Sequence, residues 1–179
     1  MSADTATTSI TTEIDTRTIT LKSSDEKTFQ VTRNQLRQIG TLDEMFRNFG
    51  HDDDKEKPIE VFPCQKVDGA TLELVVKFCE HHEKDKEPTE EELKRDKRSI
   101  PLPQWDRELM PRTEDGLEAL YVASNYLHVQ KLMDACAQFI AGMIQGKSTV
   151  EIGKILGIEC DLTPQEQETI RKENAWCED

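Results

Sequence analysis

The sequence predicts a small α/β domain followed by a C-terminal helical extension, and three observations support this fold class. Two short stretches near the N-terminus alternate polar and apolar residues, as strands do. Helical periodicity dominates afterwards and is strongest in residues 129–144. Beyond Gly146, two further helices start at clear capping signals but carry few apolar residues. Strands mixed with helices indicate one compact domain, and the sparsely apolar end indicates an extension.

The chain begins with a polar tail and a β-hairpin. Residues 1–16 are rich in Ser and Thr, with neither the basic start nor the apolar stretch of a signal peptide, so we expect a disordered tail. Residues 18–22 alternate, and residues 29–31 repeat the alternation after a polar turn at residues 23–26. This pattern predicts two antiparallel strands.

A helix and a short strand are expected next. Thr41 and Glu44 have the spacing of a capping box, so the helix should begin at Thr41, and Gly50 should end it. The acidic run over residues 51–57 is typical of a loop. Residues 59–61 have the composition of a short strand.

The middle of the chain combines a helix with a charged insertion. Asp68 is placed to cap a helix whose apolar residues, among them Leu72 and Cys79, share one face. A charged stretch near residues 83–98 is too long for an ordered loop of a packed domain, so we expect a solvated, disordered insertion. Residues 100–105 then bring an apolar strip and a Trp back to the domain.

Two helices complete the domain. The first carries Leu117, Leu120 and Tyr121. The second has a continuous apolar stripe over residues 129–144 and stops at Gly146.

The extension has strong helix starts and weak apolar faces. Ser148 begins one capping box, and Thr163 begins another with a Pro at the first helical position. The second helix, through Glu173, has Ile170 as its one apolar residue. Short helices are marginal in water without tertiary contacts, so another molecule should supply much of their packing surface. This predicts a partner-binding tail.

Composition excludes several classes of function. The chain has 36 acidic and 23 basic residues, a net charge of -13, which disfavours binding to nucleic acid or to anionic membranes. No apolar run approaches the roughly 20 residues of a membrane helix. The five scattered cysteines favour reduced thiols, and hence the cytoplasm or nucleus.

Catalytic, metal and cofactor sites find little support. The Gly146-Lys147-Ser148 triplet resembles the end of a phosphate-binding loop but lacks the upstream Gly, so a helix stop followed by a cap is the better interpretation. Cys79 and the two following His residues lack a second pair of zinc ligands. Cys177 lies among acidic residues with no His nearby, which disfavours its thiolate. We expect an adaptor rather than an enzyme, with no metal and no cofactor.

Four stretches are characteristic in combination. They are residues 19–25, 75–82, 124–127 and 171–178. Together they resemble the S-phase kinase-associated protein 1 family, the adaptors of cullin–F-box ubiquitin ligases, and the resemblance runs from about Thr18 to the last residue. It implies a BTB/POZ-type domain over residues 17–127, containing the charged insertion, and an F-box-binding helical extension over residues 128–179.

The resemblance also implies two binding surfaces. Asn125 and Tyr126 match an Asn-Tyr pair that contacts the N-terminal domain of a cullin. Ten residues match the segment that faces the F-box: Met143, Ile144, Ile152, Ile155, Leu156, Ile158, Ile170, Asn174, Trp176 and Cys177. For Met143 and Ile144, core packing is an equal alternative. Trp176, on a nearly polar helix end, has the character of an interface hot spot.

The sequence departs from the family pattern at several places. Glu26 stands where a Gly is usual in the turn, and Asp43 stands where the family usually has Lys. Residues 118–122 (Glu-Ala-Leu-Tyr-Val) replace a more aliphatic Phe-Glu-Leu-Ile-Leu run, and residues 128–131 also differ. Thr149 occupies the place of a Pro that is modified in some lineages. Several changes lie near the cullin side, so F-box binding is the firmer inference, and the chain has the pattern of a divergent paralogue.

The leading hypothesis is a non-catalytic adaptor that bridges F-box substrate receptors to a cullin in an SCF-type ubiquitin ligase. The alternative is a structural protein that self-associates as a homodimer or larger assembly through the same C-terminal surface.

Overall fold

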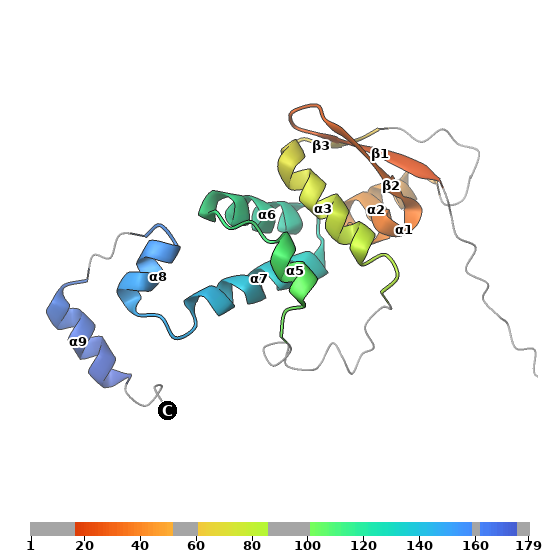
Figure 1. The fold of residues 1–179 in the computed structure, drawn as a ribbon. Helices are drawn as coiled ribbons and strands as arrows, with labels where there is room; N and C mark the ends of the chain where they lie inside the picture. Colours follow the sequence, from red (N-terminus) through yellow and green to blue (C-terminus); the bar gives the residue numbers. More distant parts are fainter. Residues whose placement is uncertain (1–16, 52–60, 86–100, 159–161, 175–179) are drawn as a thin grey trace, which may run out of the picture. The chain divides into compact units, whose positions relative to one another are not determined.

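The computed structural model describes residues 17–51, 61–85, 101–158 and 162–174 (Figure 1). The chain divides into two compact units, residues 1–85 and residues 86–179. The predicted tail, most of the loop predicted after Gly50 and most of the charged insertion lie outside the described residues, as do Trp176 and Cys177.

The first unit contains a three-stranded mixed sheet. Its strands are β1 (Thr18–Ser23), β2 (Thr28–Thr32) and β3 (Phe62–Cys64). They lie in the order β2-β1-β3, with β1 antiparallel to β2 and parallel to β3. Ile19 pairs with Val31 and Leu21 with Phe62, and all four side chains are buried. The predicted hairpin is confirmed.

The strand expected at residues 59–61 is placed too early. Residues 59 and 60 lie outside the described residues, and Val61 precedes β3 with 51% of its surface exposed. The ladder runs from Phe62 to Cys64, whose side chains are buried on either side of an exposed Pro63. Val61 has the β-branched side chain typical of strands, but the residues that fill the core begin one position later.

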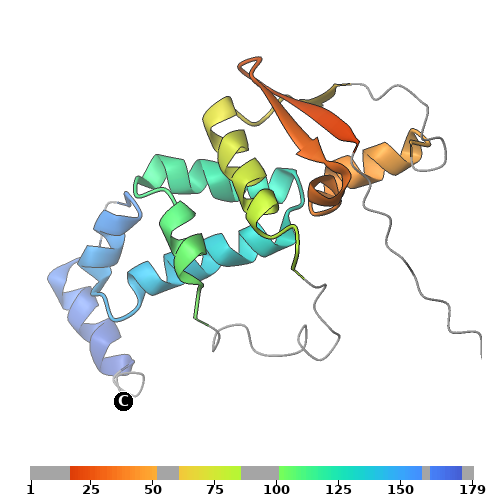
Figure 2. The same ribbon diagram turned by 45° about the vertical axis from the view of Figure 1, so that its right-hand side comes forward.

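Three helices belong to the first unit. They are α1 (Arg33–Arg37), α2 (Gly40–Asn48) and α3 (Gly69–His81). Helix α3 begins as predicted, because Asp68 Oδ1 accepts the N–H of Thr71 at 3.0 Å. It packs against β2 and α1 (Figure 2). Its apolar face places Leu72, Val75 and Phe78 in the core.

The start of α2 differs from the prediction. The capping box expected at Thr41 is not formed, and Ile39 precedes the helix without a side-chain cap. Because α1 ends immediately before, the N–H groups of Leu42 and Asp43 bond to the carbonyl of Ile39, which places Thr41 inside the first turn. The predicted end at Gly50 is confirmed, since this residue has the positive φ of +73° that favours glycine after a helix.

A buried ion pair joins α1 to α2. Arg33 is fully buried, and its Nη1 lies 2.5 Å from Oδ1 of Asp43. The guanidinium also stacks over the ring of Phe46, 4.6 Å from its centroid. The other carboxylate oxygen of Asp43 pairs with the exposed Arg47 at 2.6 Å. The acidic residue that departs from the family pattern therefore balances a buried cation.

A carboxylate fastens the β1–β2 turn to the start of α3. Asp25 Oδ1 accepts the N–H of Gly69 at 2.7 Å and the hydroxyl of Ser23 at 2.6 Å. The hydrogen bond from Ser23, followed by the one from Lys27, lowers the pKa of Asp25 to about 2. A side chain on Gly69 would collide with the side chains of Lys27 and Asp25, which would have to shift.

The second unit is helical. Its described helices are α5 (Gln104–Leu109), α6 (Glu114–Tyr126), α7 (Gln130–Ile144), α8 (Thr149–Ile155) and α9 (Pro164–Glu173). Helices α6 and α7 pack against each other (Figure 2), with Leu120, Leu132 and Cys136 fully buried. Among the described helices none is long and apolar enough to cross a membrane.

The turn between α6 and α7 contains an unusual residue. His128 has a φ of +57°, and the N–H of Val129 bonds to the carbonyl of Ser124 at 2.8 Å. This is the bond of a Schellman helix end, in which Gly is the usual residue at the left-handed position. His128, one of the residues noted in 128–131, therefore has a strained backbone conformation two residues after Tyr126.

Candidate partner-binding surface

The two helices of the extension bury none of their described side chains. Neither α8 nor α9 contains a buried residue. In this part of the chain the side chains of Val150, Ile158 and Ile170 are 42%, 62% and 39% exposed. Their starts are nevertheless well made. The prediction of helices with strong caps and little apolar surface to bury is confirmed for the described residues.

Each cap is a reciprocal pair of hydrogen bonds. The Ser148 hydroxyl accepts the N–H of Glu151, and the Glu151 carboxylate accepts the N–H of Ser148 at 2.9 Å. Thr163 and Glu166 form the same arrangement at α9. These hydrogen bonds from the backbone and hydroxyl lower the pKa of both glutamates.

A Schellman turn ends α8 and aims its last apolar side chains. Gly157 has a φ of +62°, and the N–H of Ile158 reaches back to the carbonyl of Gly153 at 2.8 Å. The carboxylate of Glu114, at the start of α6, lies against Gly157, where any side chain would collide with it. Gly157 thus permits both the helix end and the close approach of the Glu114 side chain.

Helix α8 borders an apolar groove of about 670 Å³ in the second unit. Its floor and walls come from the segment before α6, from α6 itself, from the end of α7 and from α8. The residues that line it are Pro111, Arg112, Thr113, Glu114, Leu117, Glu118, Tyr121, Ile140, Met143, Lys154, Ile155, Leu156 and Ile158. Apolar side chains from three helices converge there, with charged residues at the edges.

Four of the residues predicted to face an F-box lie together in this groove. They are Met143, Ile155, Leu156 and Ile158. Ile144 and Ile152 are half-buried and do not line it. Both alternatives for Met143 retain support, since it is partly packed and also borders the groove.

The remaining predicted residues lie apart from the groove. Ile170 and Asn174 belong to the end of α9, where Ile170 lines a separate shallow depression that begins at Leu162. Asn174 caps the helix end by donating from Nδ2 to the carbonyl of Ile170 at 2.8 Å. Trp176 and Cys177 follow directly but lie outside the described residues.

Sequence reasoning missed part of this surface. Leu117, Tyr121 and Ile140 line the groove but read as core residues of their helices from periodicity alone. Tyr121 is 39% exposed, so it is not an interior residue of the α6–α7 pair. One signal in the sequence could have indicated this. The charged Glu118 lies three positions before Tyr121, which places Tyr121 at the edge of the apolar face of the helix.

The predicted cullin-contacting pair lies at the C-terminal end of α6. Asn125 is exposed and Tyr126 is half-buried. Val122, one turn earlier, is 55% exposed and was not singled out from the sequence. Because residues three and four apart share a helix face, Val122 lies on the same face as the pair and presents an exposed apolar side chain there.

The described residues offer little for catalysis. Burial raises the pKa of Cys64 to about 11 and that of Cys79 and Cys136 to about 12, so these thiols are poor nucleophiles. No group of three His, Cys, Asp or Glu residues in the described ranges is arranged to hold a metal ion.

Comparison with known proteins gives a consistent result. The model of the Skp1 family tetramerisation domain matches residues 17–84, and that of the Skp1 family dimerisation domain matches residues 130–177. A Skp1-related protein of Caenorhabditis elegans is 39% identical over 91% of this chain and 93% of its own length. The SCF ubiquitin ligase complex protein SKP1a of Dictyostelium discoideum is 37% identical over 90% and 96%. The E3 ubiquitin ligase complex SCF subunit sconC of Talaromyces stipitatus is 33% identical over 90% and 97%.

Proposed function

This chain belongs to the Skp1 family, and on that premise we propose that it is the adaptor of an SCF-type E3 ubiquitin ligase. In this role it joins F-box substrate receptors to the N-terminal domain of a cullin and performs no chemistry itself. The relatives named as SCF subunits match about nine tenths of the chain, which supports the proposal over both units.

One observation carries the proposal furthest. Two helices with complete capping boxes bury no side chain, and beside α8 lies an apolar groove. A surface of this kind is stabilised when a partner covers it, because burial of exposed apolar side chains is favourable. The F-box is the partner that the family membership suggests, and the groove and α9 are the surfaces it would cover.

A separate surface would receive the cullin. Val122, Asn125 and Tyr126 lie on α6 and do not line the groove, and Val122 and Asn125 are exposed. A bridge requires two surfaces that can be occupied together. We assign the cullin to this end of α6.

The remaining properties follow from the same role. The raised pKa of the buried thiols disfavours a ubiquitin thioester on Cys64, Cys79 or Cys136. The net charge of -13 disfavours nucleic acid and anionic membranes. We place the protein in the cytoplasm and the nucleus, where its cysteines stay reduced.

A second candidate function is self-association. The matched model over residues 130–177 is described as a dimerisation domain, and the exposed apolar residues of α8 and α9 fall within it. A second copy of the chain would then compete with the F-box for the same surface, and the protein could act as an assembly unit.

Size measurement tests the proposal. The purified chain is mixed with an F-box domain and then with a cullin N-terminal domain, and the mass is followed by light scattering. An adaptor gives a one-to-one complex with the F-box and a ternary complex with the cullin. If the chain stays a homo-oligomer and takes up neither protein, the adaptor role is wrong and the structural role remains.

Amide exchange tests the surface. Protection should rise from Ile152 to Ile170 when the F-box is added, with little change near Phe29 in the hairpin. Trp176→Ala should weaken the complex by about 2 kcal/mol if this residue is a hot spot. Full protection of α8 and α9 in a dilute monomer would mean that they already pack on their own unit.

A further inference from the structure

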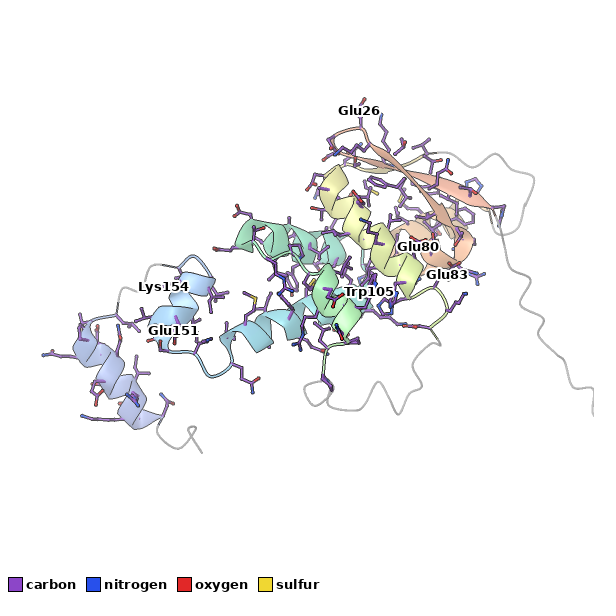
Figure 3. All side chains as sticks on the ribbon, viewed as in Figure 1. Glu26, Glu80, Glu83, Trp105, Glu151 and Lys154 are labelled. Atoms are coloured by element: carbon purple, nitrogen blue, oxygen red, sulfur yellow. The ribbon has the colours of Figure 1, made fainter. Side chains whose placement is uncertain are left out.

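The apolar groove carries opposite charges on its two walls. Glu118 lines it from α6, and Lys154 lines it from α8 (Figure 3 labels Lys154 and Glu151 on that helix). Both side chains are exposed. Neither forms an ion pair with another residue in the parts of the chain that the structure describes.

Two further charged residues line the groove. Arg112 stacks over the ring of Phe139, with its guanidinium 5.8 Å from the centroid. Glu114 is exposed, and it lies four residues before Glu118 on α6, so it adds negative charge to the α6 side. A bound molecule would therefore meet acidic side chains on α6, Glu118 among them, and the basic Lys154 on α8.

The lining of the groove suits the apolar face of a helix. Its lining supplies Leu117, Ile140, Met143 and Ile155, which an amphipathic helix would cover with residues spaced by three and four. Residues that flank such a face lie beside the two walls. A flank with Lys or Arg complements Glu118, and a flank with Asp or Glu complements Lys154.

We propose that the groove selects a partner helix whose apolar face is flanked by a basic side and an acidic side. This deepens the proposed function, on which it rests, by giving the chemistry of the partner helix. Glu118 and Lys154 then act as selectivity residues and fix the direction in which the helix lies, because reversing it would place like charges together. A uniformly basic or uniformly acidic helix meets one repulsive wall in either direction.

Three synthetic peptides provide the test. Each is a 16-residue stapled helix with the same Leu/Ile face, and they differ in their flanks: Lys on one side and Glu on the other, Lys on both sides, or Glu on both sides. Binding to the full chain is measured by fluorescence anisotropy. We expect the mixed peptide to bind roughly 5- to 30-fold more tightly than either uniform peptide, with the preference declining at high salt.

Charge reversal then separates the two walls. Glu118→Lys should move the preference toward the acidic peptide, and Lys154→Glu should move it toward the basic peptide. Glu44→Lys on α2 and Lys147→Glu are the matched controls, because they make the same charge changes at exposed positions outside the groove. They should leave the order of the three peptides unchanged.

Each remaining outcome contradicts the proposal. Equal binding of the three peptides, no binding by any of them, or a preference that survives both reversals would show that the walls do not select. F-box and cullin complexes of the same proteins are measured in parallel. If those complexes form while the peptides show no charge preference, the selectivity is wrong and the adaptor role stands. If the wild-type chain binds neither F-box nor cullin, the adaptor role itself fails.

Discussion

Removal of the Asp43 carboxylate should destabilise the first unit far more than loss of a surface ion pair. Arg33 is fully buried, so Asp43→Ala leaves a guanidinium in the core without its closest carboxylate. Loss of one member of a buried pair typically costs about 3–5 kcal/mol. We expect about 3 kcal/mol here, since the stack on Phe46 persists. That is a large share of the roughly 5–15 kcal/mol that holds a domain folded.

Two further variants test whether the buried charge causes the loss of stability. Arg47 also pairs with Asp43, but it is 63% exposed, so Arg47→Ala should cost at most about 1 kcal/mol. The double variant Arg33→Met/Asp43→Leu removes both charges and fills similar volume, and it should lie within about 1 kcal/mol of the wild type.

Urea unfolding followed by far-ultraviolet circular dichroism gives the three free energies. Hydrogen exchange at Leu36 and Leu42 shows whether the loss is confined to the first unit. The reasoning is refuted if Asp43→Ala costs no more than Arg47→Ala. It is equally refuted if the double variant is as unstable as the single one, because loss of the carboxylate beside a buried guanidinium would then not be the cause.

Three further predictions concern other parts of the chain. His128→Gly should raise the free energy of unfolding by about 1 kcal/mol in a urea titration, because Gly adopts the left-handed turn without strain. No gain would mean that the His128 side chain makes a stabilising contact that offsets the strain. The pKa of Asp25 is about 2 against 3.8 for an unperturbed carboxyl, so its contribution to stability is complete above about pH 4 and is lost as the pH falls toward 2. Asp25→Asn should therefore lose less stability than the wild type across that interval in thermal unfolding, and equal losses would contradict the role of Asp25. Changing Asn125 and Tyr126 together to Lys should weaken cullin binding and spare the F-box in pull-down assays, and loss of both would mean that the surfaces are not independent.

The elements predicted correctly have signals that lie within a few residues. Asp68, Ser148 and Thr163 each begin a helix through a hydrogen bond to a residue three positions on, so the sequence contains both partners. The hairpin can be predicted because polar and apolar residues alternate along both strands. Thr41 shows the limit of this reasoning, since the adjoining helix α1 decides where α2 begins.

The missed elements are short. Helices α1 and α5 have five and six residues, too few to show a helical period. A cap signal did exist for α1, because Thr32 and Gln35 form a capping box. For α5, Pro103 precedes the helix without a side-chain cap, so the sequence offered only an apolar strip.

Only part of the candidate surface was predicted, because the sequence of one helix does not show which other helices cover it. Periodicity identifies the apolar face of α7 but does not say which of its residues another helix covers. Cys136 is fully buried, whereas Met143 borders the groove two turns later on the same stripe. That distinction depends on where α6 and α8 lie beside α7, and residues far from Met143 in the sequence decide it.

Pro63 at the centre of β3 limits how the protein can aggregate. The three-residue strand lies at one edge of the described sheet, and a proline has no amide hydrogen to offer an incoming strand. A foreign strand that approached this edge would lack a donor in the middle of its ladder, which protects the sheet from growth into an extended β-stack on that side. Misassembly through β3 is thus suppressed, and association on that side of the sheet is left to surfaces other than the strand edge.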